Sequence, residues 1–275
     1  MRPQALTIAG SDSSGGAGIQ ADIKTFLALG VYGASVITAI TAQNTAEVRD
    51  IYPLPAELVV SQLRAVMDDL DIRAAKTGML PSPELIKTLA EEWERYPQVP
   101  LVVDPVLVST SGFQLAAREA LAALKELLLP RAALVTPNWQ EMEALAGCRL
   151  ESEKEWLQAG EELLAAGAKA VLLKGGHRGG SLACDVLLTP EGKREFAAPR
   201  LDTKHGHGTG CTLSAAVTAG LAAGCRLEEA VAKAKDYLTA ALREALPVGK
   251  GAGPVDHGVG LSSKWQIAAE GRPGR

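Results

Sequence analysis

The chain has 275 residues, of which 47% are hydrophobic and 4% aromatic, and its formal net charge at pH 7 is −4. A chain of this length can form one α/β domain with a large core. The small negative charge, the absence of long runs of one sign and the few aromatic side chains exclude a nucleic-acid surface and a base-stacking platform.

Cysteine and histidine spacing predicts an intracellular protein without a zinc site. Cys148, Cys184, Cys211 and Cys225 show no CxxC spacing, and the four histidines form no HxxxH pair. Scattered cysteines in a long chain are typical of reduced thiols. The apolar run at residues 5–10 is too short for a signal peptide or a membrane span. We therefore expect a cytoplasmic protein that does not interact with membranes.

Short apolar runs alternate with amphipathic stretches along the chain. The expected buried strands, each closed by Gly, Pro or polar residues, are 5–10, 34–40, 74–78, 101–105, 133–137 and 170–176. The expected helices, with apolar residues three and four apart, are 55–70, 82–95, 116–128, 152–166 and 228–245. Residues 183–189 and 193–199 are predicted to form an antiparallel edge hairpin. This alternation indicates a parallel sheet with helices on both faces.

No repeat, low-complexity linker or change of composition divides the chain. We expect one domain over residues 1–261 and a polar tail over residues 262–275 that is loosely held or packs on the surface. Ligands of an open parallel sheet bind beyond the carboxyl ends of its strands. The polar residues that close each strand are therefore the candidates for a functional site.

The stretch HGHGTGCTLSAA, residues 205–216, combines glycines with the start of a predicted helix. Gly206, Gly208 and Gly210 permit a tight turn, and the first amides of a helix from Thr209 are unpaired and carry partial positive charge. Such a junction binds anions, phosphate above all. The alternative is a plain glycine-rich loop with Thr209 as helix cap. The stretch is not a Walker A loop, because no GK[ST] follows its glycines.

Cys211 lies in the first turn of that predicted helix, where the helix N-terminus lowers the pKa of a thiol. It is either a covalent nucleophile with His207 as base, or a base or guide for a substrate hydroxyl. The third interpretation, a small buried residue, is the usual place of a free cysteine.

A second glycine-rich loop, GSDSSGGAGIQAD at residues 10–22, follows the first predicted strand. Gly16, Gly18 and Ala21 fit a loose GxGxxA dinucleotide pattern, but no acid closes the next strand near Ile40. A loop that wraps a small polar molecule explains the pattern better. Asp22 either points back towards that molecule or complements the helix dipole.

Charged residues close three other strands. Asp104 ends the apolar strand of LVVDP, and Asn138 and Glu141 lie three apart at a helix start. These residues could hold Mg²⁺ through water or form caps. Lys174 ends AVLLK and could reach a nucleotide phosphate; Lys76 in AAKTG is a weaker case. An anion loop, strand-end carboxylates and a strand-end lysine together indicate phosphoryl transfer.

These residues together resemble the ribokinase-like superfamily and, within it, the hydroxymethylpyrimidine and phosphomethylpyrimidine kinases of thiamin biosynthesis. The resemblance extends to about residue 260 and is carried by ALTIAGSDSSGGAGIQADIKTF, YGASVITAITAQNT, KTGML, VVDPV, TPNWQE, LLKGGH, HGTGCTLSAA and GPVDHG. It implies a three-layer α/β/α fold with a mostly parallel central sheet.

The resemblance also implies roles for the matching residues. The residues that would line a pyrimidine pocket are Gly10, Ala17, Asp22, Gln43, Met79 and Val106. Gln43 would bond the ring amine edge, and Asp22 would lie near the hydroxymethyl group. The residues that would serve Mg²⁺ and the phosphates are Asp104, Asn138 and Glu141. Those that would hold ATP phosphates are Lys174, Thr203, Thr209 and Lys235. Cys211, with the backbone of Gly208 and Gly210, would stand at the reacting groups.

The implied activity is transfer of the γ-phosphoryl group of ATP, with Mg²⁺, to 4-amino-5-hydroxymethyl-2-methylpyrimidine and then to its monophosphate. The backbone amides of residues 208–210 would stabilise the transferring group, and Cys211 would position the acceptor and act as a weak base. The acceptor phosphate of the second step would need a cation, for which His205, His207 and Lys235 are candidates. Residues 41–50 would fold over the pyrimidine.

Three other hypotheses compete with this one. A pyridoxal kinase would share the cysteine loop, but its substrate offers a phenolic oxygen where an aminopyrimidine requires the Gln43 amide. A catalytically silent pyrimidine-binding protein would not need Asp104 and Lys174. An NAD enzyme lacks its ribose-binding acid. Apolar residues in helices 18–29 and 209–224 would form either a homodimer interface or core.

Overall fold

The computed structural model describes residues 1–107, 118–176 and 179–261, and the polar tail predicted over 262–275 lies outside the described residues. In the described ranges the strands form one sheet. Its parallel strands are β1 (Gln4–Asp12), β2 (Tyr32–Gln43), β4 (Ile72–Thr77), β5 (Leu101–Val103), β6 (Leu134–Val135) and β7 (Val171–Leu173). Its antiparallel strands are β3 (Val48–Pro53), β8 (Leu182–Thr189) and β9 (Gly192–Pro199).

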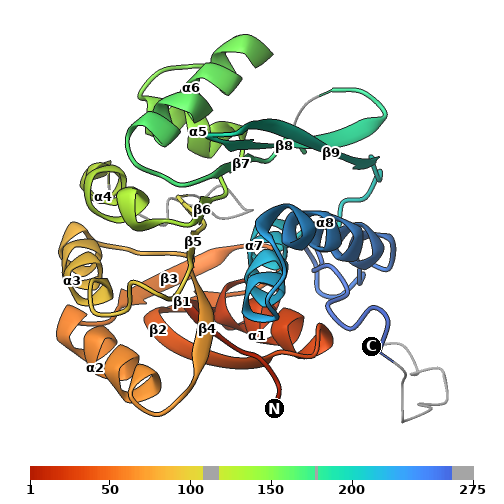
Figure 1. Cartoon of the computed structure of the whole chain (residues 1–275). Helices are drawn as coiled ribbons and strands as arrows, with labels where there is room; N and C mark the ends of the chain where they lie inside the picture. Colours follow the sequence, from red (N-terminus) through yellow and green to blue (C-terminus); the bar gives the residue numbers. More distant parts are fainter. Residues whose placement is uncertain (108–117, 177–178, 262–275) are drawn as a thin grey trace, which may run out of the picture.

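The strand order is β3-β2-β1-β4-β5-β6-β7-β8-β9, so the parallel strands form the centre and the antiparallel strands form both edges (Figure 1). The six strands and the edge hairpin predicted from the sequence are confirmed. The edge strand β3 was not predicted.

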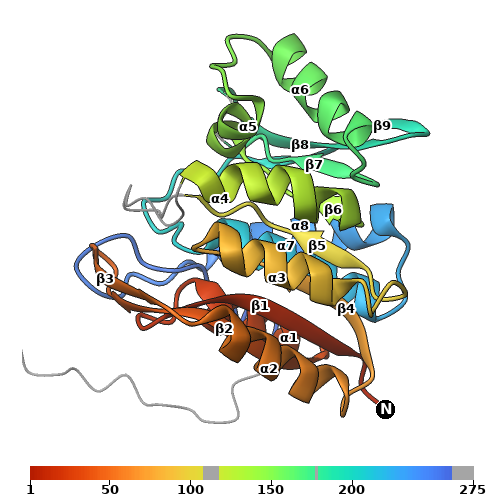
Figure 2. The same ribbon diagram turned by 90° about the vertical axis from the view of Figure 1, so that its left-hand side faces the viewer.

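Helices cover both faces of the sheet (Figures 1 and 2). One layer contains α2 (Ala56–Met67), α3 (Pro83–Trp93), α4 (Arg118–Ala123), α5 (Trp139–Ala146) and α6 (Glu153–Ala165). The other contains α1 (Gly18–Ala28), α7 (Thr209–Ala222) and α8 (Leu227–Arg243). The predicted α/β/α architecture is therefore confirmed. The stretch predicted as a helix over 116–128 continues beyond α4 as a π turn (Leu124–Leu128) and a 3₁₀ turn (Leu129–Arg131), and residues 108–117 are outside the described ranges.

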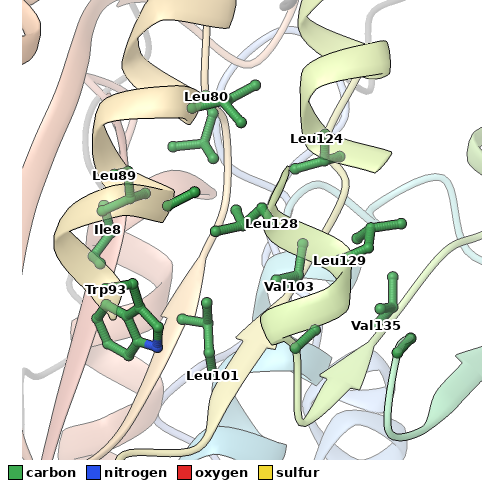
Figure 3. Packing of buried hydrophobic residues seen from close by; sticks show 14 of the residues in the cluster. Ile8, Leu80, Leu89, Trp93, Leu101, Val103, Leu124, Leu128, Leu129 and Val135 are labelled. Carbon is green, nitrogen blue, oxygen red and sulfur yellow. The ribbon is translucent and has the colours of Figure 1, made fainter. Parts of the chain in front are cut away.

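The central strands are buried on both sides, which explains their continuous apolar runs. Leu101 and Val103 of β5 point into the core under α3 and α4, where they pack with Trp93 and Leu128 (Figure 3). Val102, between them, points to the opposite face and packs under α7 and α8. Alternation along an extended chain thus gives each face its own core.

Two predicted helix starts are confirmed by their caps. The Ser82 hydroxyl accepts a hydrogen bond from the Leu85 amide at 3.2 Å, and the Ser152 hydroxyl accepts one from the Glu155 amide at 3.2 Å. A serine before an acidic first turn satisfies one of the free amides of the helix, as its sequence indicated.

Helix α7 lies between α1 and α8, and most of its residues are buried. The apolar stretch 209–224 is therefore mainly core, one of the two uses that the sequence left open. On α1, Leu27 remains 58% exposed. None of the described helices has the length and apolar character that a membrane crossing requires.

Candidate active site

A cavity of about 960 Å³ lies at the carboxyl ends of the parallel strands. The predicted site residues that line it are Gly10, Ala17, Gln43, Met79, Asp104, Val106, Asn138, Glu141, Lys174, Thr203, Gly208, Thr209, Gly210, Cys211 and Lys235. These residues are spread over the whole chain, and the sheet brings them to one place. Asp22 is the predicted site residue that does not line the cavity.

The glycine-rich loop before α7 has the geometry of an anion site. Gly208 is the cap of α7 with φ = +80°, a left-handed conformation that favours glycine, and no side chain caps the helix. Thr209 is the first helical residue, so the alternative that made Thr209 the cap is wrong. Thr209, Gly210 and Cys211 of this first turn line the cavity. The Thr209 amide donates to the Gly206 carbonyl at 3.3 Å, so the amides of Gly210 and Cys211 are the ones that can receive a phosphate.

Lys174 lies opposite this loop and is held by carboxylates. Its Nζ is 2.9 Å from Oδ1 of Asp104 and 3.5 Å from Oε2 of Glu141. Burial opposes the charge of Lys174, but these two carboxylates outweigh it and raise the pKa of the ammonium. A Cβ on Gly210 would lie 3.4 Å from Lys174 Nζ, so the cation borders the anion loop.

Asp104 is buried and fully engaged. Oδ1 accepts hydrogen bonds from Lys174 and from the Thr136 hydroxyl at 2.9 Å, and Oδ2 accepts one from the Ser214 hydroxyl at 3.0 Å. Burial raises the pKa of this carboxyl, but Lys174 and Lys76 outweigh burial and lower it. Asp104 is therefore ionised at neutral pH.

Asn138 and Glu141 form a capping box at the start of α5. The Asn138 side chain accepts a hydrogen bond from the Glu141 amide at 2.9 Å, and Glu141 Oε2 accepts one from the Asn138 amide at 2.7 Å. The capping alternative for this pair is thus observed. Burial raises the pKa of Glu141 to about 7, although the Lys174 ammonium attracts its charge.

The donor set fits Mg²⁺ only if phosphates and water complete it. No group of three His, Cys, Asp or Glu side chains that could hold a metal occurs in the described ranges. Mg²⁺ is usually bound through one or two carboxylates together with substrate phosphates and water. Asp104 and Glu141, beside the anion loop, supply two such carboxylates.

Cys211 lies half-buried in the first turn of α7 and lines the cavity. Burial raises the pKa of its thiol to about 12, and the Lys76 ammonium offsets only part of that effect. The lowered thiol pKa expected at a helix N-terminus is therefore wrong, because burial has the larger effect on this thiol. At neutral pH the side chain is a thiol that can touch a substrate but is a poor nucleophile.

Asp22 and Lys76 form an ion pair behind the cavity wall. Both side chains are 0% exposed, and Lys76 Nζ donates to Asp22 Oδ1 at 2.6 Å. The Thr7 hydroxyl donates to Asp22 Oδ2 at 2.6 Å. Asp22 thus has its partners within the protein core, and the structure does not bring it to the cavity where the resemblance would use it.

The acceptor side of the cavity is shaped by close backbone approaches. A Cβ on Gly10 would lie 2.5 Å from Met79 Cε, so Met79 requires the glycine. Gln43 ends β2. The Ser13 hydroxyl donates to its backbone carbonyl at 2.6 Å and accepts from its backbone amide at 2.8 Å. Residues 41–50, expected to fold over the ligand, form the end of β2, a turn and the start of β3.

The turn between β2 and β3 is tied to the C-terminal part of the fold. The Thr45 hydroxyl accepts hydrogen bonds from the amides of Lys250 and Gly251, both at 3.1 Å. The segment 249–253 therefore supports the turn that follows Gln43.

The far side of the cavity contains Lys235, which donates to Asp185 Oδ2 at 2.6 Å. Oδ1 of Asp185 accepts a hydrogen bond from the Gly175 amide at 2.8 Å, so Asp185 joins α8 to the turn after Lys174. His205 does not line the cavity, and its Nδ1 accepts a hydrogen bond from the Gly253 amide at 3.0 Å.

The model of the phosphomethylpyrimidine kinase family matches residues 12–256. The chain belongs to this family. A hydroxymethylpyrimidine/phosphomethylpyrimidine kinase of Rhizobium meliloti is 51% identical to it over 92% of this chain and 96% of that protein. A thiamine biosynthesis bifunctional protein of Geobacter sulfurreducens is 48% identical over 93% of this chain, which spans only 52% of that longer protein.

A solved structure with the same fold is that of Bacillus subtilis pyridoxal kinase in complex with ADP. It has a TM-score of 0.86 and 38% identity, with 94% of this chain and 98% of that chain covered. The fold is thus shared between the phosphomethylpyrimidine kinase family and a pyridoxal kinase. The chain is 51% identical to the Rhizobium meliloti pyrimidine kinase and 38% identical to this pyridoxal kinase.

Several residues at or next to the cavity were not found from the sequence. Asp12, Thr136, Asp185 and Ser214 all make buried hydrogen bonds to cavity residues. Thr136 and Asp185 carried weak signals, as polar residues at the end of β6 and within the buried part of β8. Ser214 is one small residue among many in α7, and its neighbours in the sequence do not indicate a contact with Asp104.

Proposed function

We propose that this chain is an ATP-dependent kinase that phosphorylates 4-amino-5-hydroxymethyl-2-methylpyrimidine on its hydroxymethyl group and then converts the monophosphate to the diphosphate, in thiamin biosynthesis. The observation that carries the proposal is the position of Cys211 and the free amides of α7. They border Lys174 on one side, and they line one cavity with Ala17, Gln43 and Met79 on the other.

On the donor side, the backbone amides at the start of α7 receive the transferring phosphoryl group, apart from that of Thr209, which donates to the Gly206 carbonyl. The left-handed backbone of Gly208 starts α7 with no side chain across its free amides, so a phosphate oxygen can approach them. Lys174 adds a cation beside Gly210. Fixed donors of this kind stabilise charge that develops during transfer without having to reorganise.

On the acceptor side, the Gln43 amide meets the amine edge of the ring. Its side chain lines the cavity together with Ala17, and there an amide can both donate to a ring nitrogen and accept from an amine. The Cys211 thiol stands beside the acceptor hydroxyl and orients it. With a pKa of about 12 the thiol is not a strong base at rest, and the loose transition state of phosphoryl transfer releases the hydroxyl proton late.

Asp104 and Glu141 would hold Mg²⁺ that arrives with the nucleotide. When bound, the ion would neutralise charge on the β- and γ-phosphates. The protein itself keeps Asp104 ionised through Lys174 and Lys76, and it orients Glu141 through the capping box with Asn138. The Asp104 carboxylate would then interact with both Lys174 and Mg²⁺.

The kinase domain is proposed to span residues 1–261, in the cytoplasm. A homodimer would use the exposed side chains of α1, among them Leu27, since α7 is mainly core. Sedimentation velocity of the purified protein would give its assembly state, and replacement of Leu27 by Glu would dissociate a dimer formed there.

Pyridoxal kinase is the second candidate, because the solved pyridoxal kinase shares the fold over nearly the whole chain. Pyridoxal offers a phenolic oxygen where the aminopyrimidine offers an amine. The Gln43 amide can serve either, but only the pyrimidine uses its donor and its acceptor together. Replacement of Gln43 by Met should therefore weaken turnover of the pyrimidine more than that of pyridoxal.

The test is the release of ADP with Mg-ATP and each of three acceptors: the hydroxymethylpyrimidine, its monophosphate and pyridoxal. Wild type and Cys211→Ala are compared, and nucleotide binding is measured for both. Turnover with both pyrimidines and little with pyridoxal supports the proposal. Turnover mainly with pyridoxal favours the second candidate. Tight pyrimidine binding without turnover of any acceptor would make this a binding protein and reject the kinase mechanism.

A further inference from the structure

Asp12, the last residue of β1, connects an unusual number of groups. Its Oδ1 accepts from the amide and the hydroxyl of Ser14, both at 2.8 Å. Its Oδ2 accepts from the amides of Gly16 at 3.2 Å and Ala17 at 2.8 Å, and it lies 2.9 Å from His207 Nε2. The carboxylate thus shapes residues 13–17, here termed the acceptor loop, and reaches residues 206–211, here termed the phosphoryl loop.

The two loops touch through their backbones. A Cβ on Gly208 would lie 1.9 Å from the Gly16 carbonyl oxygen, and a Cβ on Gly16 would lie 2.4 Å from Cδ2 of His207. No side chain fits at either position while the contact is kept. The glycines are therefore needed for loop contact as well as for phosphate access.

His207 is held from its backbone as well. Its amide donates to the Gly253 carbonyl at 3.1 Å, and its own carbonyl accepts from the Val255 amide at 3.4 Å. The side chain is only 7% exposed, and that of Asp12 is 4% exposed. The pair is thus buried between three segments, and neither side chain can turn into solvent without opening the loop contact.

We propose that Asp12 and His207 are positioning residues that lock the acceptor loop to the phosphoryl loop and so set the distance between the bound acceptor and the transferring phosphoryl group. This inference rests on the proposed kinase function. Ala17 and Gly18 line the acceptor side of the cavity, and Gly208 follows His207 directly. The Asp12–His207 bond is therefore a direct side-chain link between the two halves of the reaction.

Stability alone does not explain such a pair. A buried, hydrogen-bonded carboxylate loses much of its stabilising effect to desolvation, and apolar replacements of buried charged groups are often as stable. The His207 imidazole and the neighbouring amides, with Ser14, lower the pKa of Asp12 to about 2 against burial, so the carboxylate stays charged at all working pH values. What the pair supplies is a fixed geometry between loops, and a displacement of about 1 Å can slow a reaction by about 100-fold.

The decisive experiment compares His207→Ala with His207→Gln. The glutamine amide can still donate to Asp12, whereas alanine cannot. We expect kcat of His207→Ala to fall about 100-fold with the Kd for ATP within about threefold of wild type. His207→Gln should recover at least about tenfold of that loss. The double variant Asp12→Asn/His207→Ala should be no slower than the slower single variant, since both remove one bond.

Gly16→Ala provides a second route to the same result, because its Cβ must displace the His207 ring without removing a hydrogen-bonding group. Gly179→Ala is the matched control: a Cβ there meets no atom of the described residues within 4 Å, and Gly179 is exposed and does not line the cavity. We expect Gly16→Ala to lose kcat as His207→Ala does and Gly179→Ala to match wild type. Thermal unfolding of each variant shows whether a loss of kcat is caused by misfolding. If His207→Ala does not fold, the comparison of Gly16→Ala with Gly179→Ala tests the proposal instead.

Three outcomes would overturn the proposal. They are a kcat of folded His207→Ala within threefold of wild type, a loss that resides wholly in the Kd for ATP, and a glutamine variant no faster than alanine. If wild type turns over no acceptor, the kinase function fails separately. Hydrogen exchange at the amides of Gly16 and Ala17 then still tests the link, which predicts exchange at least about tenfold faster in His207→Ala.

Discussion

The buried ion pair between Asp22 and Lys76 offers the clearest quantitative test of the structure. Both side chains are fully buried and their charged atoms lie 2.6 Å apart. At an effective dielectric constant of about 20, that separation corresponds to an attraction of about 6 kcal/mol. Burial raises the pKa of Asp22 even with Lys76 present, so the carboxylate depends on the ammonium to stay charged.

Removal of one partner should therefore be costly. Among the described residues, Lys76→Met leaves the Thr7 hydroxyl as the remaining side-chain donor to the buried Asp22 carboxylate. We expect a loss of about 3–5 kcal/mol in the free energy of unfolding, since an uncompensated buried charge must be neutralised or hydrated. With an unfolding entropy of about 2.1 cal/mol/K per residue, 4 kcal/mol lowers the Tm of a chain of this length by about 7 °C.

The assay is urea unfolding of four proteins: wild type, Lys76→Met, Asp22→Asn and the double variant. The double variant should recover at least half of the loss of either single variant, because it leaves no unpaired charge. The exposed pair between Arg73 and Asp71, with side chains 57% and 70% exposed, is the control, and Asp71→Asn should cost less than about 1 kcal/mol. A single-variant loss below about 1 kcal/mol, or losses that simply add in the double variant, would refute the reasoning.

Three further predictions concern single groups near the site. With Cys211 as the only cysteine left, alkylation by iodoacetamide should be slow at pH 8 and keep accelerating above pH 10, because burial raises the thiol pKa to about 12; a plateau below pH 9 would contradict this. Burial and Lys24 lower the pKa of His257 from 6.5 to about 4. The contribution of the neutral His257 to stability is therefore complete above pH 6.5 and is lost as the pH falls to about 4. The urea midpoint of wild type should fall more steeply with decreasing pH in that range than the midpoint of His257→Gln. Gly208→Ala forces a Cβ into the Gly16 carbonyl and a left-handed backbone on alanine, so kcat should fall at least about 100-fold while circular dichroism stays native; near-normal turnover would show that the loops need not touch.

The fold could be predicted from the sequence wherever a segment is buried on one or both faces. The central strands were found because burial on both faces makes them continuously apolar, and α3 and α6 were found from apolar residues three and four apart. The edge strand β3 was missed because only Val48 of its six residues is buried, so VRDIYP shows neither an apolar run nor a clear alternation. An edge strand is defined by its partner, which a local pattern does not contain.

The site was predicted less completely than the fold. Asp104 and Lys174 were identified because a charge at the end of an apolar strand has few structural explanations, but their mutual ion pair joins residues 70 positions apart and no local signal shows it. Asp22 was assigned to the substrate because of the family resemblance, whereas its position after a glycine-rich loop left open that it only complements the helix dipole. The structure directs it to Lys76 instead, since the face of α1 that carries Asp22 packs against the sheet.

The glycines of HGHGTGC show why the contacts between the acceptor loop and the phosphoryl loop were not predicted. A glycine-rich turn before a helix is fully explained by phosphate binding, so nothing in the stretch requires a second cause. Yet Gly208 is needed equally because the Gly16 carbonyl occupies the space of its side chain. In the same way, an aspartate among serines and glycines is typical of a turn, and Asp12 does cap one through Ser14. Its bond to His207, 195 positions later, forms only when the two loops are in contact. The local sequence around Asp12 therefore does not show that this residue connects them.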